Sequence, residues 1–433
     1  MEAGYLPKPD SVFHKKMLPS HNSSMPAPFS VGMEELSFTG PAVFRGKKIA
    51  LVVNAAWNFW NFRRALIQAL LQRGCEVVLI APEDDYRPML QAAFPEVAFV
   101  SLKKLSRKSL SVWGNSRTYL ELKAVLAQER PDCAVFYTIK PNIFGSFAVR
   151  ALSIPAIAVV TGVGYAGTAP LPIRYLVFWL YRQAFRFVQK AVFQNYDDRR
   201  EFLLAEALTP EKATVIKGSG IDTRYYAPAA RPSNQAPIFI FVGRFLSEKG
   251  IREFVKAVAQ VRRGAPGTRF QILGSPDPGN PASILPAELQ SWISEGLVEY
   301  LGQVEDVRPF VQRADVLVLP SYYREGMPRA LLEGMAMGLP IITTDSVGCR
   351  DTVEDGRNGF IVPAGDTSAL AAAMLRFAHL PDPGKQAMGH YSREKAIREF
   401  CNEVILPRYL SLIGEALQTA PYTPRPPAPA KTA

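Results

Sequence analysis

Two cations, Arg244 and Lys249, stand close together in the segment 241–250, which reads FVGRFLSEKG. The apolar run before them predicts a strand, Gly243 predicts a tight turn, and the residues from Gly250 onward predict a helix. A departing diphosphate needs positive charge that is already in place, and Arg, Lys and a helix N-terminus supply it without a metal. We interpret Arg244 and Lys249 as candidate diphosphate ligands, although a solvated strand–turn–helix junction would show the same pattern.

Two carboxylates bracket the predicted start of a second helix, in the segment 325–333, which reads EGMPRALLE. Glu325 precedes a glycine, and Pro328 is expected to be the first helical residue, so that the N–H groups of this turn suit an anion. Glu333 follows about one and a half turns later. Carboxylates accept hydrogen bonds from vicinal hydroxyls, so one glutamate would hold a ribose and the other a sugar. The alternative for Glu333 is a solvated helix face.

The elements that must position these residues alternate between short apolar runs and longer amphipathic stretches. Strands are expected at 48–53, 75–80, 132–137, 238–242, 270–273, 298–301 and 314–319, with helices at 61–72, 118–128, 250–262 and 328–337. Such alternation is typical of parallel sheets covered by helices, and ligands bind at the carboxyl ends of their strands. We therefore expect an α/β protein with two Rossmann-like domains facing across a cleft.

The domain boundaries follow from shifts in composition. We expect a disordered tail at 1–45, an N-terminal domain at 46–230 and a C-terminal domain at 236–390. A last helical segment from Ser392 to Leu417 would return across the cleft, before a proline-rich tail at 418–433. The four cysteines form no metal or disulfide pattern, and no signal peptide or membrane span is apparent. These features favour a cytoplasmic protein without a metal.

Basic residues are concentrated in the N-terminal half of the chain. Residues 1–230 hold 28 Lys and Arg against 18 Asp and Glu, whereas the remainder holds 22 against 21. A one-sided basic surface indicates a polyanionic partner such as anionic lipid or nucleic acid. Because no recognised nucleic-acid-binding motif is present, we expect no nucleic acid partner. Lysines and arginines spread over a solvated surface are the alternative.

Two aromatic segments of the N-terminal half are candidates for acceptor or membrane contact. Trp57 and Trp60 follow the first predicted strand, where they would stack on a sugar or line a lipid groove, unless they only pack at a helix start. The segment 171–190, LPIRYLVFWLYRQAFRFVQK, mixes aromatic residues with Arg174, Arg182 and Arg186. This pattern is typical of a helix lying in a membrane interface, with a core-facing helix as the alternative.

At these separations the two motifs resemble the family 4 retaining glycosyltransferases, which have the GT-B fold. The resemblance extends over residues 46–417 and includes Gly218-Ser-Gly-Ile-Asp222 and the segment 333–340, EGMAMGLP. It implies that Arg244 and Lys249 bind the donor diphosphate after the Gly243 turn, that Glu325 faces the donor sugar and that Glu333 binds the ribose. The backbone of Gly326, Met327 and Pro328 would contact the sugar and phosphates. The implied reaction is front-face attack by the acceptor hydroxyl, with no covalent nucleophile and no cofactor beyond the UDP-sugar substrate.

One departure from the family concerns the acceptor. Many members carry a histidine after the fourth strand, where this chain reads YTIKPNIFG and places Lys140. This version resembles relatives that act on polyprenyl-linked sugars, in which a cation would lie near the acceptor diphosphate; a plain surface lysine is the alternative. We therefore expect transfer of an N-acetylhexosamine from a UDP-sugar to a polyprenyl-diphosphate-linked sugar by a peripheral protein on the cytoplasmic face of the inner membrane. A glycosyltransferase with a soluble acceptor and a nucleotide-sugar epimerase of the same fold are the alternatives.

Overall fold

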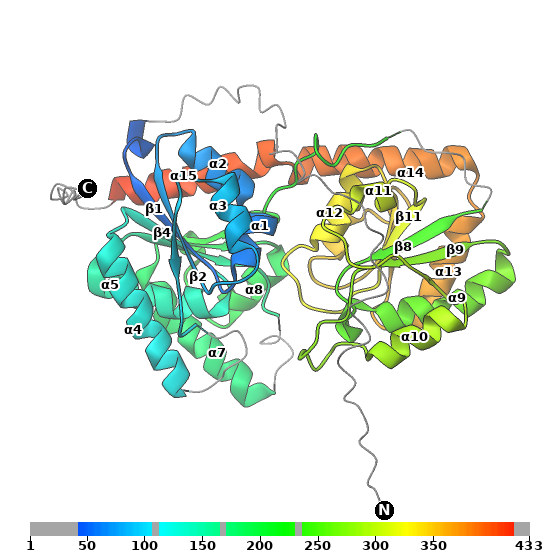
Figure 1. The fold of residues 1–433 in the computed structure, drawn as a ribbon, viewed down its shortest axis with the longest axis horizontal. Helices are drawn as coiled ribbons and strands as arrows, with labels where there is room; N and C mark the ends of the chain where they lie inside the picture. The colour runs from blue at the N-terminus through cyan, green and yellow to red at the C-terminus, as the bar shows by residue number, and fades with distance from the viewer. Residues whose placement is uncertain (1–41, 106–111, 165–169, 230–235, 420–433) are drawn as a thin grey trace, which may run out of the picture. The chain divides into compact units, whose positions relative to one another are not determined.

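The computed structural model describes residues 42–105, 112–164, 170–229 and 236–419. They form two Rossmann-like domains, each with an all-parallel sheet between helices (Figure 1). In the first domain, alternate residues of each strand enter different cores. Ile49 and Leu51 pack with the helices α1 (Ala56–Phe62), α2 (Arg64–Leu71) and α15 (Asn402–Thr419), whereas Ala50 and Val52 pack on the opposite face. Because both faces are covered, the strands are apolar over most of their length, as their sequences predict.

The N-terminal domain has a seven-stranded sheet in the order β3-β2-β1-β4-β5-β6-β7. Its strands are β1 (Lys48–Val52), β2 (Glu76–Ala81), β3 (Ala98–Ser101), β4 (Cys133–Tyr137), β5 (Ala156–Val160), β6 (Lys190–Phe193) and β7 (Ala213–Val215). Its helices are α1 (Ala56–Phe62), α2 (Arg64–Leu71), α3 (Arg87–Ala93), α4 (Val112–Glu129), α5 (Ser146–Leu152), α7 (Leu171–Ala184) and α8 (Tyr196–Leu204).

The C-terminal domain has a six-stranded sheet in the order β10-β9-β8-β11-β12-β13. Its strands are β8 (Ile238–Val242), β9 (Arg269–Leu273), β10 (Glu299–Tyr300), β11 (Val316–Leu319), β12 (Ile341–Thr344) and β13 (Gly359–Val362). Its helices are α9 (Ile251–Gly264), α10 (Pro286–Ser294), α11 (Arg308–Val311), α12 (Arg329–Ala336), α13 (Thr367–Ala378) and α14 (Asp382–Lys395).

The strand order reverses direction once in each sheet, and these points position the candidate residues. In the first sheet β1 lies between β2 and β4, and in the second β8 lies between β9 and β11. The loops after β8 and β11 therefore leave the sheet side by side, at the place where ligands of such sheets bind. These are the two loops that carry the motifs 241–250 and 325–333.

The chain crosses between the domains twice, and the two crossings are hydrogen-bonded to each other. The Ile221 amide donates to the Phe400 carbonyl at 2.9 Å, and the Asn402 amide donates to the Ile221 carbonyl at 3.0 Å. Gly220 suits this crossing because its φ of +85° is a backbone conformation that other residues rarely adopt. After this crossing, helix α15 (Asn402–Thr419) packs its apolar face into the core of the N-terminal domain.

The structure corrects four details of the predicted elements. The helix expected at 61–72 is two helices, because Arg63 leaves the helical conformation with φ −124° and ψ −3°. The helical segment expected at 392–417 is interrupted at Cys401, which is extended because it pairs with Ile221. Pro328 precedes helix α12 as its N-cap, since its ψ of 115° is not helical. Phe44, expected in the tail, is buried in the first domain; 1–41 and 420–433 lie outside the described residues.

Candidate active site

The loops after β8 and β11 bring Lys249 and Glu325 together as an ion pair. Lys249 Nζ donates to Glu325 Oε1, and the Ser321 hydroxyl donates to the same oxygen at 3.3 Å. Only 12% of the lysine side chain and 15% of the glutamate side chain are exposed. Partial exclusion of water strengthens their attraction, so that each charge holds the other in place.

A glycine permits the close approach of these two loops. Gly250, directly after Lys249, has φ +76°, and a Cβ there would lie 2.1 Å from the Pro320 carbonyl oxygen. Any side chain would therefore push the Lys249 turn away from the end of β11. Gly243 adopts φ +153° at the end of β8, and its carbonyl oxygen packs against Gly274, where a Cβ would lie at 1.9 Å. The predicted glycine turn is thus present, and Gly274 leaves room for its carbonyl oxygen.

Arg244 has a different partner from Lys249. Its Nη1 donates to Asp277 Oδ2 at 2.7 Å, and the two side chains are 45% and 34% exposed. Exposed ion pairs contribute little to stability because water and salt screen them. Arg244 can therefore turn from Asp277 toward an anionic ligand at small energetic cost, whereas Lys249 is already fixed.

Glu333 is buried on helix α12, with 8% of the residue exposed, so the solvated helix face considered for it is wrong. Arg329, one turn earlier, donates from Nε to Glu333 Oε1 at 2.8 Å. Burial, and then the charge of Glu333, raise the pKa of the Tyr226 hydroxyl well above its usual range. Arg329 and Tyr226 were not among the predicted site residues, although the i,i+4 spacing of Arg329 and Glu333 signals such a pair.

The backbone beside Glu325 is held by the N-terminal domain. The Gly326 amide donates to the Thr161 carbonyl at 3.2 Å, and the Gly164 amide donates to the Arg324 carbonyl at 3.1 Å. The expectation that the turn's N–H groups await an anion is therefore corrected for Gly326, whose N–H already has a protein acceptor. The Met327 side chain belongs to the core of the C-terminal domain, and Pro328 has no N–H to offer.

An acidic and basic cluster from both domains lies next to this loop. Arg324 forms ion pairs with Asp198 and Glu201 of helix α8, the former at 3.4 Å. Burial raises the pKa of the Asp198 carboxyl to about 6, against the opposing effects of Asn195 and Arg324. Sequence reasoning missed these residues. Asn195 before helix α8 is readable as an N-cap, but its contacts with the other domain are not.

The acceptor candidates of the N-terminal domain lie after the neighbouring strands β1 and β4. Trp57 is 36% exposed and stacks edge-to-face on Phe62, with ring centroids 5.2 Å apart. Trp60 is partly buried, with the Arg64 guanidinium 4.4 Å above its ring. Lys140 is partly exposed, and burial lowers the pKa of its ammonium group. The sheet order thus places Trp57 and Lys140 at the same edge of the sheet, and their contact with one acceptor stays a prediction.

Helix α7 has both a core face and an exposed face, so the core-facing interpretation holds for one side, and contact of the other side with a membrane stays a prediction. Its core face packs Phe178, Tyr181 and Ala184 into the domain. Its exposed face carries large apolar side chains: Leu171, Tyr175, Leu176 and Trp179. Two of its predicted cations are paired with acids of the α8 region: Arg174 with Glu201 at 2.7 Å, and Arg182 with Glu206 at 3.1 Å.

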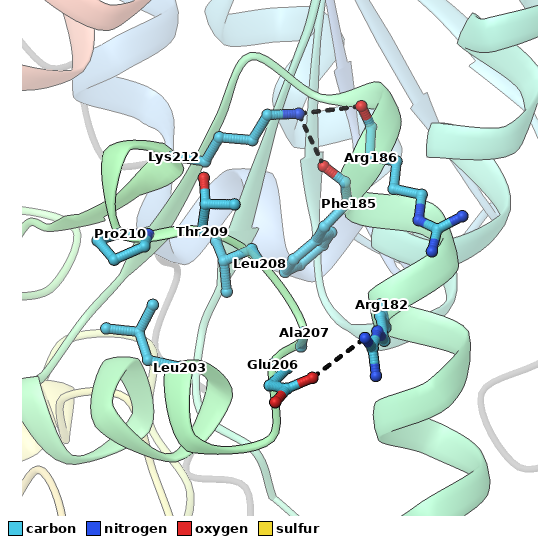
Figure 2. Close-up of a pocket in the computed structure, with 10 residues that line it drawn as sticks. All are labelled: Arg182, Phe185, Arg186, Leu203, Glu206, Ala207, Leu208, Thr209, Pro210 and Lys212. Carbon is cyan, nitrogen blue, oxygen red and sulfur yellow. Dashed lines mark hydrogen bonds and ion pairs between the residues drawn. The ribbon is translucent and has the colours of Figure 1, made fainter.

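A groove of about 480 Å³ lies beside the C-terminal end of helix α7. Figure 2 shows Arg182 turned toward Glu206, and Lys212 turned toward the carbonyl oxygens of Phe185 and Arg186, at 3.2 and 2.9 Å. The remaining lining side chains are mostly apolar: Phe185, Leu203, Ala207, Leu208 and Pro210, together with Thr209. The groove is therefore apolar within and basic at one edge.

Within 42–105, 112–164, 170–229 and 236–419, no helix is both long enough and apolar enough to span a bilayer. Within the same ranges, no three His, Cys, Asp or Glu residues are grouped as metal ligands.

Family models match both domains. Residues 60–218 match the model described as "Glycosyl transferase 4-like domain", and residues 236–379 match "Glycosyl transferases group 1". Among solved structures, sucrose-phosphate synthase from Thermosynechococcus elongatus covers 86% of this chain and 99% of its own, with a TM-score of 0.71 and 20% identity. HepE from Anabaena in complex with UDP-glucose has a TM-score of 0.69 and 16% identity, covering 85% of this chain and all of that one.

Two curated relatives align over most of their length. The N,N'-diacetylbacillosaminyl-diphospho-undecaprenol alpha-1,3-N-acetylgalactosaminyltransferase of Campylobacter jejuni is 29% identical over 72% of this chain and 84% of the relative. The UDP-Gal:alpha-D-GlcNAc-diphosphoundecaprenol alpha-1,3-galactosyltransferase of Escherichia coli is 24% identical over 68% of this chain and 78% of the relative. With a matching glycosyltransferase model on each of its two Rossmann-like domains, this chain is an enzyme that belongs to the family 4 glycosyltransferases of GT-B fold.

Proposed function

We propose that the enzyme transfers an N-acetylhexosamine, with retention of anomeric configuration, from a UDP-sugar to a sugar carried on polyprenyl diphosphate. The observation that carries this proposal is the alignment with the Campylobacter N-acetylgalactosaminyltransferase over 84% of that relative's length. The Escherichia coli relative, also named for a diphosphoundecaprenol acceptor, supports the same acceptor class. The epimerase alternative has no support among these relatives.

The geometry suits a departing nucleoside diphosphate. In our proposal, Lys249 and Arg244 neutralise the diphosphate while Glu333 accepts hydrogen bonds from the ribose hydroxyls. Glu325, held by Lys249 and Ser321, faces the donor sugar. The bond from the anomeric carbon to the phosphate oxygen breaks as the acceptor hydroxyl attacks from the same face. The hydroxyl proton passes to the departing phosphate, so the products are UDP and the α-linked glycan, without an enzyme-bound sugar.

We further propose that the N-terminal domain docks on the cytoplasmic face of the inner membrane, where a lipid-linked acceptor would be reached. The exposed apolar face of α7 and the adjoining groove support this docking. Because Arg174 and Arg182 are paired with glutamates, their attraction to anionic lipid is partly cancelled. We therefore assign most of the adhesion to Tyr175, Leu176 and Trp179, with Arg186 as the main cation of this face.

A donor panel tests the proposed reaction. Purified enzyme is incubated with UDP-GlcNAc, UDP-GalNAc, UDP-glucose or UDP-galactose and a membrane extract containing polyprenyl-diphosphate-linked sugars. We expect UDP release to require both the extract and an N-acetylhexosamine donor, with one added sugar in the lipid-linked product. Transfer to a water-soluble sugar alone would favour the soluble-acceptor alternative. A second UDP-sugar appearing without UDP release would favour epimerisation.

Sedimentation with liposomes tests the docking surface. Replacing Tyr175, Leu176 and Trp179 by serine should lower binding to anionic liposomes at least tenfold, because each buried large apolar side chain contributes roughly 1.5–3 kcal/mol. Arg186→Gln should lower it about fivefold, since one cation near such a surface contributes about 1 kcal/mol, and salt should remove this part.

Leu120→Ser is the matched control. Leu120 lies on helix α4 of the same domain and is exposed to about the same extent as Leu176. Its binding should equal that of the unmodified protein. Gel retardation with DNA and RNA is run in parallel. Retardation of nucleic acid at physiological salt, combined with indifference to anionic liposomes, would show that the basic half serves another polyanion.

A further inference from the structure

Asn195 joins the N-terminal domain to the loop that carries Glu325. Its side-chain oxygen accepts from the Asp198 amide at 2.7 Å, which makes it the N-cap of helix α8. Its side-chain nitrogen donates to the Gly326 carbonyl at 3.1 Å and to Asp198 Oδ2 at 3.0 Å. Only 1% of the residue is exposed. One side chain thus caps a helix in one domain and binds the backbone of the other.

The backbones of the two domains are in direct contact around this hydrogen bond. A Cβ at Gly326 would lie 2.0 Å from Gln194 Oε1 and 2.8 Å from the Thr161 carbonyl. A Cβ at Gly162 would lie 2.6 Å from the Gly326 nitrogen. Both glycines therefore permit a contact that any side chain would prevent. The Glu325 loop cannot move away from the N-terminal domain without breaking this packing.

Arg324 holds the same loop from its other side. Its guanidinium pairs with Glu201 and Asp198 of helix α8, and its carbonyl accepts from the Gly164 amide at 3.1 Å. The residue next to it in the chain, Glu325, meets Lys249. The N-terminal domain therefore binds the backbone on both sides of Glu325, whose side chain pairs with Lys249.

We infer that Asn195 is a positioning residue, which fixes the Glu325–Gly326 backbone so that the Lys249–Glu325 pair is aligned only while the two domains are in contact. This inference rests on the proposed role of Glu325 at the donor sugar. Arg324 acts in the same contact. A loop released from Asn195 would still bind a nucleotide through Glu333 and the cations, but would place the carboxylate less accurately. Misplacement of this kind lowers turnover more than it lowers affinity.

The serine variant separates helix capping from positioning. Asn195→Ser keeps a good N-cap for helix α8, but its short side chain cannot reach the Gly326 carbonyl. At saturating donor and acceptor we expect kcat to fall at least tenfold, while the Kd for UDP changes less than threefold and the Tm falls less than in Asn195→Ala. Asn195→Ala removes the helix cap as well as the hydrogen bond to the Gly326 carbonyl and should lower the Tm further.

Asp366→Ala is the matched control. The Asp366 side chain caps helix α13 by accepting from the Ala369 amide at 2.9 Å, within the C-terminal domain. We expect this variant to lower the Tm and to leave kcat unchanged, which shows that loss of a helix cap alone does not slow the reaction. In an Arg324→Ala background, Asn195→Ser should lower kcat by less than a further threefold, because both residues serve one contact.

The outcomes distinguish the inference from the proposed function. An unchanged kcat in Asn195→Ser, with normal turnover by the unmodified enzyme, would overturn the positioning role and leave the proposed reaction standing. Equal loss of UDP affinity and kcat in this variant would also overturn it, because the residue would then serve donor binding. Failure of the unmodified enzyme to bind UDP would instead overturn the proposed function.

Discussion

Replacing Lys249 by alanine is expected to lower turnover about a hundredfold or more, the scale of losing one fixed charge-stabilising donor. Lys249 lies beside Glu325, with 12% of its side chain exposed, so its charge acts through little water. The variant also leaves Glu325 without its cation in a largely buried place, which destabilises the fold by about 1–3 kcal/mol. Turnover is therefore measured well below the Tm of the variant, with UDP release as the readout.

Arg244→Ala is the informative companion to this variant. We expect a comparable loss of turnover, but almost no change in Tm, because the Arg244–Asp277 pair is exposed and contributes little to stability. Activity of the unmodified enzyme should persist in EDTA, since the proposed charge stabilisation uses side chains alone. Near-normal rates in both variants would refute the donor-site assignment, and complete loss of activity with chelator would indicate a metal-dependent reaction.

Several strands could be predicted because burial on both faces leaves a direct trace in the sequence. The run Ile238–Val242 is apolar at every position, since its side chains enter the core on either side of the sheet. The sheet edge that carries the candidate site could also be predicted. Gly243 and Gly250 mark the turns, and the loops after neighbouring strands must leave the sheet together.

Contacts between residues far apart in sequence could not be predicted from either segment alone. The break at Arg63 accompanies a cation–π contact with Tyr137, 4.0 Å from the ring centroid, and the break at Cys401 depends on Ile221. Neither position holds a proline or glycine that would announce it. In the site, the Gly326 amide looked available for an anion because its acceptor, Thr161, belongs to the other domain.

The ion pairs of helix α7 could not be predicted either, because they too join residues far apart in sequence. The sequence predicted a basic, aromatic helix, and its exposed face carries Tyr175 and Trp179 together with Arg182. The pairing of Arg174 and Arg182 with Glu201 and Glu206 depends on how helix α8 packs beside it. The cations of one helix counted alone therefore overstate its free positive surface wherever acids of the next helix face it.

Glu333→Ala should weaken UDP binding about tenfold to a hundredfold, whereas Glu325→Ala should leave UDP affinity nearly unchanged and depress turnover with donor bound. A hydrogen bond to a charged group contributes about 1.5–3 kcal/mol, and Glu333 would accept bonds from ribose hydroxyls that UDP and the UDP-sugar share. Glu325 would act on the sugar alone. Isothermal titration with UDP and with the UDP-sugar, beside steady-state rates, measures the two roles separately.

The surroundings of the two glutamates explain why their variants should differ. Glu333 accepts a hydrogen bond from Arg329. In Glu333→Ala the guanidinium of Arg329 loses this partner, so it can attract the diphosphate and offset part of the loss of UDP affinity. Arg329→Ala in the Glu333→Ala background should therefore weaken UDP binding further. Glu299→Ala is the control, because Glu299 pairs with Arg269 at the amino ends of β10 and β9, on the opposite edge of the sheet from the site. Equal loss of UDP affinity in the Glu325 and Glu333 variants would contradict this division, because both carboxylates would then contact the nucleotide rather than one contacting the sugar.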